Sequence, residues 1–532
     1  MATQRNSKQD TPTPKMMTRV ETLAKCKRNI AALLDCRDGR VIEETSYPSN
    51  CLRWVRKGPI QRLPNVQKHR NREEKKAESP SGSGIPGSVK LKIVIVGAGI
   101  GGLTTAIALK MRGFDDVVVL ERKEDGSEIG AGIQIPPNAS LLLTRLGLGP
   151  YLSTHAHTPT AVRLRRWENG ELIGLTRLNN CASEFGAKFL VIHRVGLINS
   201  LLHRARELGV QISFGKKVGS FKEGVATDSD VCREGSSGGV IWEVRADLVV
   251  GADGLHSEAR KSVLGDQVRQ DFILPTGFAA YRAVVDTEKM RKDPELEWLC
   301  RSDGQNLWIG HNRHIMTYLI NNGKSFNMVL SHPSTTDPST WSQETDIQEV
   351  RRQFSGWDPC IQKLLTLITH TLKWPLLTGT PLPTWLSHDF KTIILGDAAH
   401  PMLPYMSAGA AMAVEDGCAL AEVLSRLTSA TQLPSALKVW EEERLLRTAQ
   451  MQEASLVNGR LWHFADGPAQ RARDEAMRGD VSVDGGNGVS PNQWSDGATR
   501  QWVYGYDAEW EVREAWEKQG GDGGSWWYGA LS

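Results

Sequence analysis

The sequence lacks the features that mark membrane-spanning, secreted or metal-binding proteins. None of its apolar runs approaches the ~18 residues of a membrane helix, and no apolar segment near the N-terminus is typical of a signal peptide. The eight cysteines show no CxxC motif and no paired spacing. We therefore expect free thiols, no metal site and a cytoplasmic protein without a spanning segment, with organelle targeting by the N-terminal stretch left open.

Excess positive charge is missing from most of the chain. Residues 1–90 hold 19 Lys and Arg against 9 Asp and Glu, whereas the remainder holds 45 against 52. The net charge of +3 therefore comes from the N-terminal stretch, and we expect no nucleic-acid partner for the body of the protein. Nucleic-acid binding by residues 1–88 alone would show as a salt-dependent affinity that is lost on truncation.

Composition divides the chain into three parts. Residues 1–88 are basic and polar and end in a Ser/Gly/Pro-rich linker, which favours a disordered extension; a targeting arm or an artefact of gene prediction are the alternatives. Residues 89–455 alternate strand-like and helix-like patterns, which indicates an α/β fold with a parallel sheet. Residues 456–532 form a tail rich in Trp and Gly.

Paired strands replace this alternation between about residues 270 and 332. Residues 278–285 resemble one strand, and residues 313–320 and 325–330 flank an Asn-Asn-Gly turn, a strong signal for a β-hairpin. We expect an antiparallel sheet inserted in the α/β unit, with helices resuming after it.

The segment GAGIGG, residues 97–102, has the context of a dinucleotide-binding loop. It follows the apolar run 91–96 and precedes a helical pattern at 103–112, and a second strand, 116–120, ends on Glu121. Strand, glycine loop, helix, strand and terminal acid in this order predict a nucleotide-binding unit.

Each glycine of the loop has a separate expected purpose. Gly97 allows the tight turn, Gly99 lets the backbone approach a pyrophosphate, and Gly102 lets the helix pack on the strand. The positive end of the helix favours the anionic group, and Glu121 can accept hydrogen bonds from ribose hydroxyls. This loop alone leaves both FAD and NAD open.

A second segment, GDAAHPMLPYMSAGAAMAVEDG at 396–417, indicates FAD. It follows a short apolar strand, and Asp397 stands at the strand end as an accepting carboxylate. Small residues around Gly409 and Ala410 open a helix whose N-terminus stabilises negative charge and whose surface lets a flavin ring approach. A plain strand–loop–helix connection is the alternative, because turns also favour Gly and Pro.

A third segment, ADLVVGADGLHSEAR at 246–260, completes a resemblance. In this order the three segments resemble the group A flavoprotein monooxygenases, and in particular a fungal branch similar to salicylate hydroxylases. The resemblance covers about residues 90–455 and touches the tail at FADGP and WVYGYD. The expected fold class is α/β: a Rossmann-type FAD-binding domain, an interleaved antiparallel-sheet substrate domain and a C-terminal helical region.

The resemblance also implies an activity. NAD(P)H would bind transiently and reduce FAD, and reduced flavin would take up O2 and transfer one oxygen atom, as a flavin hydroperoxide, to a small phenolic or related aromatic substrate. A single GxGxxG loop agrees with this, because transient NAD(P)H needs no second nucleotide fold. A flavin-binding protein without turnover, or another flavin oxidoreductase, is the alternative, and the oligomeric state is left open.

The same resemblance implies cofactor contacts for residues spread along the chain. Arg194 could instead be a surface cation before a helix. Glu121 would bind the adenosine ribose, Ala131 and Gly132 the flavin side, Arg194 the phosphate or ribityl region, Asp253 the pyrophosphate, Asp397 the ribityl chain, and Gly409 and Ala410 the flavin ring.

Three side chains are candidate catalytic residues. Arg282 lies on an otherwise apolar strand face, where it would clamp a substrate carboxylate or phenolate. The alternatives are that it is paired with an internal acid or extends to solvent at the sheet edge. His314 and Tyr318 share a hairpin face and match a His-xxx-Tyr pattern of some hydroxylases in the resembled family. With a pKa near ~6.5, His314 could help to deprotonate a phenol; an exposed histidine and a packed tyrosine are the alternatives.

The loop after the second proline departs from the bacterial salicylate hydroxylases. Those enzymes place a histidine where this chain has Tyr405 and Met406, so a base at that position is excluded and salicylate itself is disfavoured as substrate. His400, before a proline, is expected to be structural. The tail tryptophans are expected to serve in packing or in a partly ordered cover, without forming a cofactor site; they are Trp494, Trp502, Trp510, Trp516, Trp526 and Trp527.

Overall fold

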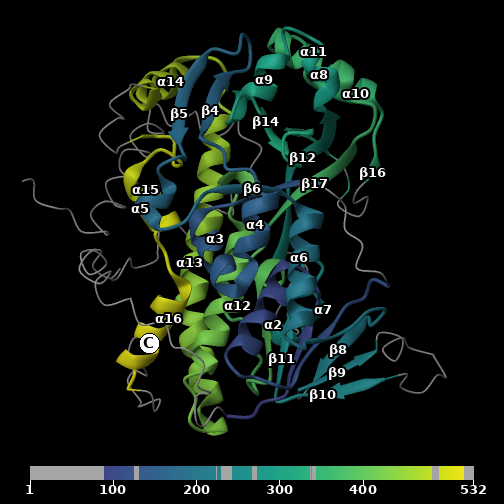
Figure 1. Cartoon of the computed structure of the whole chain (residues 1–532), viewed down its shortest axis with the longest axis vertical. Helices are drawn as coiled ribbons and strands as arrows, with labels where there is room; N and C mark the ends of the chain where they lie inside the picture. Colours follow the sequence, from purple (N-terminus) through teal and green to yellow (C-terminus); the bar gives the residue numbers. More distant parts are fainter. Residues whose placement is uncertain are drawn as a thin grey trace, which may run out of the picture.

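The computed structural model places most of the chain after the N-terminal extension (Figure 1). It describes residues 89–124, 131–222, 224–228, 242–265, 272–335, 337, 343–481 and 490–520. The expectations for residues 1–88, Trp526 and Trp527 lie outside the described residues. Within them, no helix combines the length and the apolar character that crossing a bilayer requires.

A parallel sheet forms the lower half of the molecule in Figure 1. Strands such as IVIV and LVVG are buried on both faces, as a sheet covered by helices on both sides requires. Within the described residues its strand order is β18 (Thr392–Ile394), β11 (Leu248–Gly251), β1 (Ile93–Val96), β2 (Val117–Leu120) and β7 (Gln211–Ser213).

Helices surround this parallel sheet, and α2 and α12 pack closely against each other. Both helices begin at the same end of the sheet, just after β1 and after the loop that follows β18. The helices are α2 (Ile100–Met111), α3 (Pro137–Leu143), α4 (Gly149–His155), α5 (Cys181–Phe185), α6 (Arg194–Glu207), α7 (Glu258–Leu264) and α12 (Gly409–Leu424).

Two small antiparallel sheets accompany the parallel one. The first joins β3 (Gly132–Ile135) to β6 (Leu190–His193) and crosses the middle of the molecule. The second joins β8 (Val218–Lys222), β9 (Val225–Asp228) and β10 (Glu243–Arg245) at the lower right of Figure 1.

A larger mixed sheet forms the upper half of the molecule. The predicted hairpin is confirmed, because β14 and β15 pair antiparallel from Ile320 opposite Ser325. The predicted extent of 270–332 is too narrow, since strands from earlier and later segments join the same sheet. In the described residues the order is β16 (Gln343–Glu344), β17 (Leu372–Gly379), β12 (Ile273–Asp286), β15 (Ser325–Pro333), β14 (Arg313–Ile320), β13 (Gln305–Gly310), β4 (Ala161–Arg166) and β5 (Leu172–Arg177).

The two faces of the mixed sheet have different neighbours. One face, which includes Tyr281, Ala283 and Val285 of β12, packs in an apolar core beneath four short helices at the upper right of Figure 1. The opposite face, which includes Arg282, is turned toward the parallel sheet. The covering helices are α8 (Thr287–Arg291), α9 (Glu297–Arg301), α10 (Ile347–Gln353) and α11 (Pro359–Leu367).

A long helix, α13 (Leu433–Trp462), runs along both halves of the molecule. It passes residues 455 and 456, the expected boundary between the domain and the tail, without a break. After it come α14 (Pro468–Val481), α15 (Gly497–Tyr504) and α16 (Ala508–Lys518). Because α16 packs on α12 and α13 and α14 packs on β5, the described part of the tail belongs to the folded body.

Candidate active site

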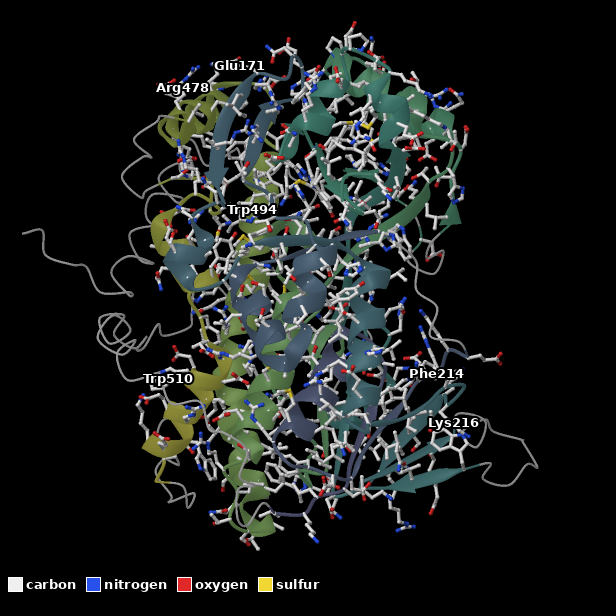
Figure 2. The ribbon with its side chains drawn as sticks, viewed as in Figure 1. Glu171, Phe214, Lys216, Arg478, Trp494 and Trp510 are labelled. Carbon is white, nitrogen blue, oxygen red and sulfur yellow. The ribbon has the colours of Figure 1, made fainter. Side chains whose placement is uncertain are left out.

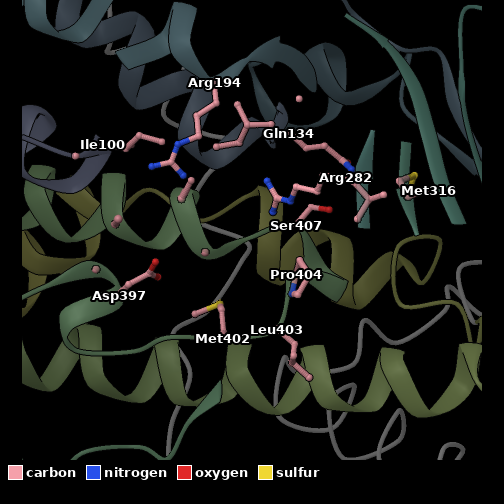
Figure 3. A pocket seen from close by; sticks show the side chains of 18 of the residues that line it. Ile100, Gln134, Arg194, Arg282, Met316, Asp397, Met402, Leu403, Pro404 and Ser407 are labelled. Carbon is pink, nitrogen blue, oxygen red and sulfur yellow. The ribbon is translucent and has the colours of Figure 1, made fainter. Parts of the chain in front are cut away.

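A cavity of about 370 Å³ lies between the two large sheets (Figure 3). Its walls come from the starts of α2, α6 and α12, from β3, and from the inner face of the mixed sheet. In Figure 3 Ile100 and Asp397 lie toward one end of the cavity and Met316 toward the other, with Arg282 between them. The cavity therefore joins the predicted nucleotide-binding loop to the predicted substrate strands.

The glycine loop has the geometry expected from its sequence. Gly97 has a φ of 109°, and a side chain there would overlap the carbonyl oxygen of Ala252. A side chain at Gly102 would overlap the carbonyl oxygen of Gly97. At Gly99, which lines the cavity, a Cβ would meet no protein atom within 4 Å. Gly99 thus faces space that a ligand can fill, whereas Gly97 and Gly102 face protein atoms.

Glu121 stands at the end of β2 beside this loop. One carboxylate oxygen accepts a hydrogen bond from the Ala98 N–H at 2.7 Å, and the other accepts from Lys123 N–H at 2.9 Å. Glu121 does not line the cavity but holds the backbone of the loop that does. Its contact with an adenosine ribose stays a prediction.

Two helix N-termini point into the cavity. Gly99 precedes α2 and Ala408 precedes α12, and in the described residues neither helix start is capped by a side chain. Their free N–H groups and positive dipole ends suit a diphosphate and an electron-rich ring. Gly409 and Ala410 line the cavity with almost no side chain in the way. The residues present therefore fit FAD.

Charged side chains complete the cofactor side. Arg194, at the first position of α6, and Asp397, in the turn after β18, line the cavity from opposite sides in Figure 3. Gly132 lines the cavity beside them, and the preceding Ala131 is buried. The predicted flavin-side residues therefore lie around one space, and their contacts with the cofactor stay predictions.

Asp253 lies behind the cavity wall. One of its carboxylate oxygens accepts from the N–H groups of Glu258 at 2.8 Å and Ala259 at 3.1 Å, at the start of α7. Burial raises the pKa of this carboxyl group. Its neighbours Ala252 and Gly254 line the cavity, so Asp253 orders the loop between them.

Asp416 is a buried acid that the sequence did not single out. Its carboxylate accepts from Gly396 N–H at 3.0 Å and from Arg444 Nε at 2.9 Å, and it pairs with His400 Nε2 at 2.6 Å. The interactions with His400, Arg444 and the Gly396 N–H lower the pKa of Asp416 despite its burial. Asp416 therefore fixes the turn that carries Asp397, and His400 has the structural place expected for it.

Glu415 extends this buried network to the tail. Its carboxylate accepts from Arg444 and Arg447, each at 2.7 Å, and from Asn138 Nδ2 at 2.6 Å. Arg447 also donates to the carbonyl oxygen of Trp502 at 2.9 Å. The signal in the sequence was an adjacent pair of acids in a helix of small apolar residues.

The cavity-facing residues of the mixed sheet lie in rows across the strands. Arg282 on β12, Val329 on β15 and Met316 on β14 are opposite one another and form a middle row. Tyr318 lies one row to one side of it and His314 one row to the other. All five line the cavity, so the two-residue periodicity of the strands correctly grouped the candidate catalytic residues.

Arg282 extends into the cavity without a described carboxylate partner. No described acid forms an ion pair with it, and its guanidinium carbon lies 5.9 Å from the centre of the Trp374 ring. The side chain is exposed in the open cavity, but desolvation by the surrounding protein groups lowers its pKa, whereas Tyr318 acts to raise it. The alternative in which an internal acid of the described residues neutralises Arg282 is therefore wrong.

Tyr318 is buried against the flavin-side strand. A side chain at Gly132 would overlap the Tyr318 ring, and the Gly132 N–H donates to Asn327 Oδ1 at 3.0 Å. Burial raises the pKa of Tyr318, so its phenol stays protonated and able to donate. The hydrogen bond between Gly132 and Asn327 thus joins the small sheet of β3 and β6 to the mixed sheet, a contact that no sequence pattern marked.

His314 lies in a different setting from the expected one. It is buried, its Nδ1 lies 2.8 Å from Nε2 of His463, and its ring contacts those of Trp462 and Tyr405 edge to face. Burial lowers the pKa of His314 to about 3. The expectation of an ordinary pKa is wrong, and a neutral histidine that resists protonation does not suit the role of base.

Two tryptophans form a further part of the wall. Trp462 ends α13 and Trp494 precedes α15; both are buried, both line the cavity, and their ring centres are 5.0 Å apart. Figure 2 places Trp494 near the middle of the molecule, whereas Trp510 lies toward the lower left. Trp494, Trp502 and Trp516 are buried, in line with the packing expected for the tail, and Trp494 in addition lines the cavity.

Comparison with known proteins agrees with this geometry. The FAD binding domain family matches residues 90–455. The chain is 33% identical over 429 residues, 79% of its length and 97% of the relative's, to the FAD-dependent monooxygenase OpS4 of Beauveria bassiana. It is 32% identical to the 3-hydroxybenzoate 6-hydroxylase of Polaromonas naphthalenivorans, over 78% of this chain and 96% of that protein.

A solved salicylate hydroxylase in complex with its substrate shares the fold. The TM-score is 0.64 and the identity 25%, with 80% of this chain and 98% of that chain covered. The confirmed fold class is a mixed α/β structure with an FAD-binding domain and C-terminal helices. The chain belongs to the FAD binding domain family and is an FAD-dependent aromatic monooxygenase, related to fungal monooxygenases and similar in structure to salicylate hydroxylase.

Proposed function

We propose that this monooxygenase uses NAD(P)H and O2 to insert one oxygen atom into an anionic or phenolic aromatic ring held on the mixed sheet. The observation that carries the proposal is the single cavity that joins the starts of α2 and α12 to Arg282 and Tyr318. FAD, when bound, accepts reducing equivalents from NAD(P)H and activates O2. The chain binds, orients and shields the reactants.

The cofactor is held mainly by backbone groups in this proposal. The N–H groups after Gly99 bind the diphosphate, with Arg194 as a nearby cation. Asp397 accepts hydrogen bonds from the ribityl hydroxyls, and the first turn of α12 at Gly409 and Ala410 lies along the flavin ring. Glu121 and Asp253 act by holding the loops; Glu121 also remains within the region expected to meet the ribose.

The substrate is held by two hydrogen-bond-donating side chains, one cationic and one neutral. The Arg282 guanidinium binds a carboxylate or phenolate, and the Tyr318 phenol donates a hydrogen bond. A cation beside a phenol lowers the phenol pKa and favours the phenolate, whose ring is the more electron-rich. Arg282 thus replaces a general base by stabilising the reactive form, and His314 orients its neighbours as a neutral group.

The test is aerobic oxidation of NADH and of NADPH by the purified flavoprotein with a panel of hydroxybenzoates. We expect substrate-stimulated oxidation and a product heavier by one oxygen, with the label incorporated from ¹⁸O2. Label incorporated from water, or retained flavin whose NAD(P)H consumption no aromatic stimulates, contradicts the proposal. The second result would favour a flavin-binding protein without turnover.

We also infer a cytoplasmic location from the cysteines. The four described cysteines, Cys181, Cys300, Cys360 and Cys418, are free thiols. Free thiols suit a reducing compartment, where reduced pyridine nucleotides are also available. Fluorescence microscopy of the full chain tests this, and import into an organelle would contradict it.

A further inference from the structure

The substrate end of the cavity has an aromatic wall built by residues beyond the matched domain. The family match ends at residue 455, and Trp462 and Trp494 follow it in the chain. Trp462 contacts His314 with ring centres 5.2 Å apart, which places the wall at the His314 end of the sheet. The wall therefore adjoins the floor formed by β14 and β15.

The loop that carries Trp494 is held in place by hydrogen bonds. Gln493 donates to the carbonyl oxygen of Ala454 at 2.9 Å and to Asn458 Oδ1 at 2.8 Å, both on α13. Asn492 donates to Thr176 Oγ1 on β5 at 3.0 Å. Trp494 is thus fixed from two sides, as a wall that selects a ligand by shape requires.

The register of the strands gives the direction of the wall. Arg282 is in the middle row and His314 is two residues along β14 from Met316 of that row. Two strand residues span about 7 Å. A ring anchored at Arg282 with its reacting edge toward the flavin side would direct its far substituents along the floor toward Trp462 and Trp494.

The floor that leads from Arg282 to the wall is apolar, and the charges of the cavity are mostly positive. Met316, Val329 and Leu307 form the middle row of this floor, beside Arg282. Among the described lining residues, Asp397 is the only acid, against the guanidinium groups of Arg194 and Arg282. Such a site favours a ligand with an anionic head and an apolar extension, and disfavours a cationic amine.

We propose that Trp494, together with Trp462, forms a specificity-determining wall that binds an apolar ring substituent of an anionic aromatic substrate. This rests on the proposed function, because Arg282 must hold the anionic head. The C-terminal tail then decides which substituent is accepted, while residues 90–455 provide the cofactor site.

The test measures dissociation constants of hydroxybenzoates from the flavoprotein by the change in flavin absorbance. The compounds are unsubstituted or carry a methyl, propyl or pentyl group on the ring, and a matched benzylamine series provides cationic heads. For the wild type we expect about fourfold tighter binding per methylene that reaches the wall. We expect Trp494→Ala to reduce this gain below about twofold while the unsubstituted compound changes little.

Two further variants keep the test decisive. Trp516→Ala removes an equally buried tail tryptophan that does not line the cavity, and it should keep the wild-type gain. If Trp494→Ala fails to retain flavin, Trp494→Phe should fold and show an intermediate gain. The proposed wall is contradicted if affinity increases equally per methylene in the wild type and the Trp494 variants. It is also contradicted if the wild type shows no such increase. Absence of binding by every hydroxybenzoate overturns the proposed function itself, and the wall with it.

Discussion

The two sides of the cavity are built from different parts of the polypeptide. The cofactor side presents backbone N–H groups and small residues, such as Gly99 and Gly409, at the ends of buried elements. The substrate side presents long side chains, such as Arg282, Tyr318 and Trp494, from strands and from the tail. Backbone recognition can be shared by many sequences, whereas side-chain recognition can change one residue at a time. The same fold can therefore keep its cofactor and alter its substrate.

The charged side chains follow the same division. Beneath the cofactor side, Asp416 and Glu415 are matched by Arg444 and Arg447 in a closed network. On the substrate side, Arg282 has no described acid within ion-pairing distance. A neutralised network serves a fixed structure, and a cation without such a partner is available to a ligand.

The largest effect is expected where the cofactor side depends on buried charge. Asp416→Asn should lower the free energy of unfolding by about 3 to 5 kcal/mol, because Arg444 and His400 lose their shared anion. Urea unfolding of the holoprotein measures it. Glu168→Gln, at an exposed ion pair, is the control and should cost no more than about 1 kcal/mol. Equal stability of the two variants would contradict the structural role of Asp416.

Arg282→Met should affect substrate binding without affecting FAD binding. It keeps the length of the side chain and removes its charge, so substrate affinity should fall about hundredfold, or about 3 kcal/mol, while FAD affinity is kept. Arg194→Met should show the reverse pattern. Titrations followed by flavin absorbance and fluorescence measure both constants. Unchanged substrate affinity in Arg282→Met would remove this residue from the site.

Two glycines separate ligand contact from protein contact. Gly99→Ala should weaken FAD about tenfold without changing the stability of the apoprotein, because its Cβ enters ligand space. Gly102→Ala should destabilise the apoprotein itself, since its Cβ meets the Gly97 carbonyl oxygen. Thermal unfolding without FAD and FAD titration distinguish the two. Wild-type FAD affinity in Gly99→Ala would show that no ligand occupies that space.

The smallest effect concerns the neutral histidine of the substrate side. With the pKa of His314 lowered to about 3, the unfolded chain binds more protons between about pH 6.5 and 3. The contribution of His314 to the free energy of unfolding is therefore complete above about pH 6.5 and decreases as the pH is lowered below that value. His314→Phe should reduce the stability loss between pH 7.5 and 5.5 by about 1 kcal/mol. Denaturant unfolding at both values measures it.

A control histidine tests the origin of that pH dependence. His203 is exposed beside Glu207, and His203→Phe makes the same substitution at the surface, away from the cavity. If the free energy of unfolding of His314→Phe depended on pH as it does in the wild type, His314 would not have the lowered pKa.

Local spacing made the cofactor side predictable from the sequence. The 97–102 loop, Asp397 and the start of α12 each lie within one short segment whose small residues have a direct physical reason. The grouping of Arg282 with its own strand face, and of His314 with Tyr318, followed from the two-residue period of strands.

The remaining parts depend on tertiary contacts that one segment cannot display. The lowered pKa of His314 comes from burial among residues such as Trp462 and His463, which are far away in the sequence. Trp494 resembled the other tail tryptophans until the fold brought it to the cavity. The boundary placed at residue 455 had no visible marker, because the helical pattern of α13 continues through it.

The alternation of the two large sheets along the chain has a consequence for synthesis on the ribosome. β11 ends at Gly251, but its neighbour β18 begins at Thr392, after nearly all of the mixed sheet has been made. Likewise β4 is synthesised long before its neighbour β13, which begins at Gln305. Both strands leave the ribosome with an unpaired edge, and such edges promote aggregation while distant partners are awaited. Slow translation at low temperature and chaperone supply should therefore govern the yield of active enzyme.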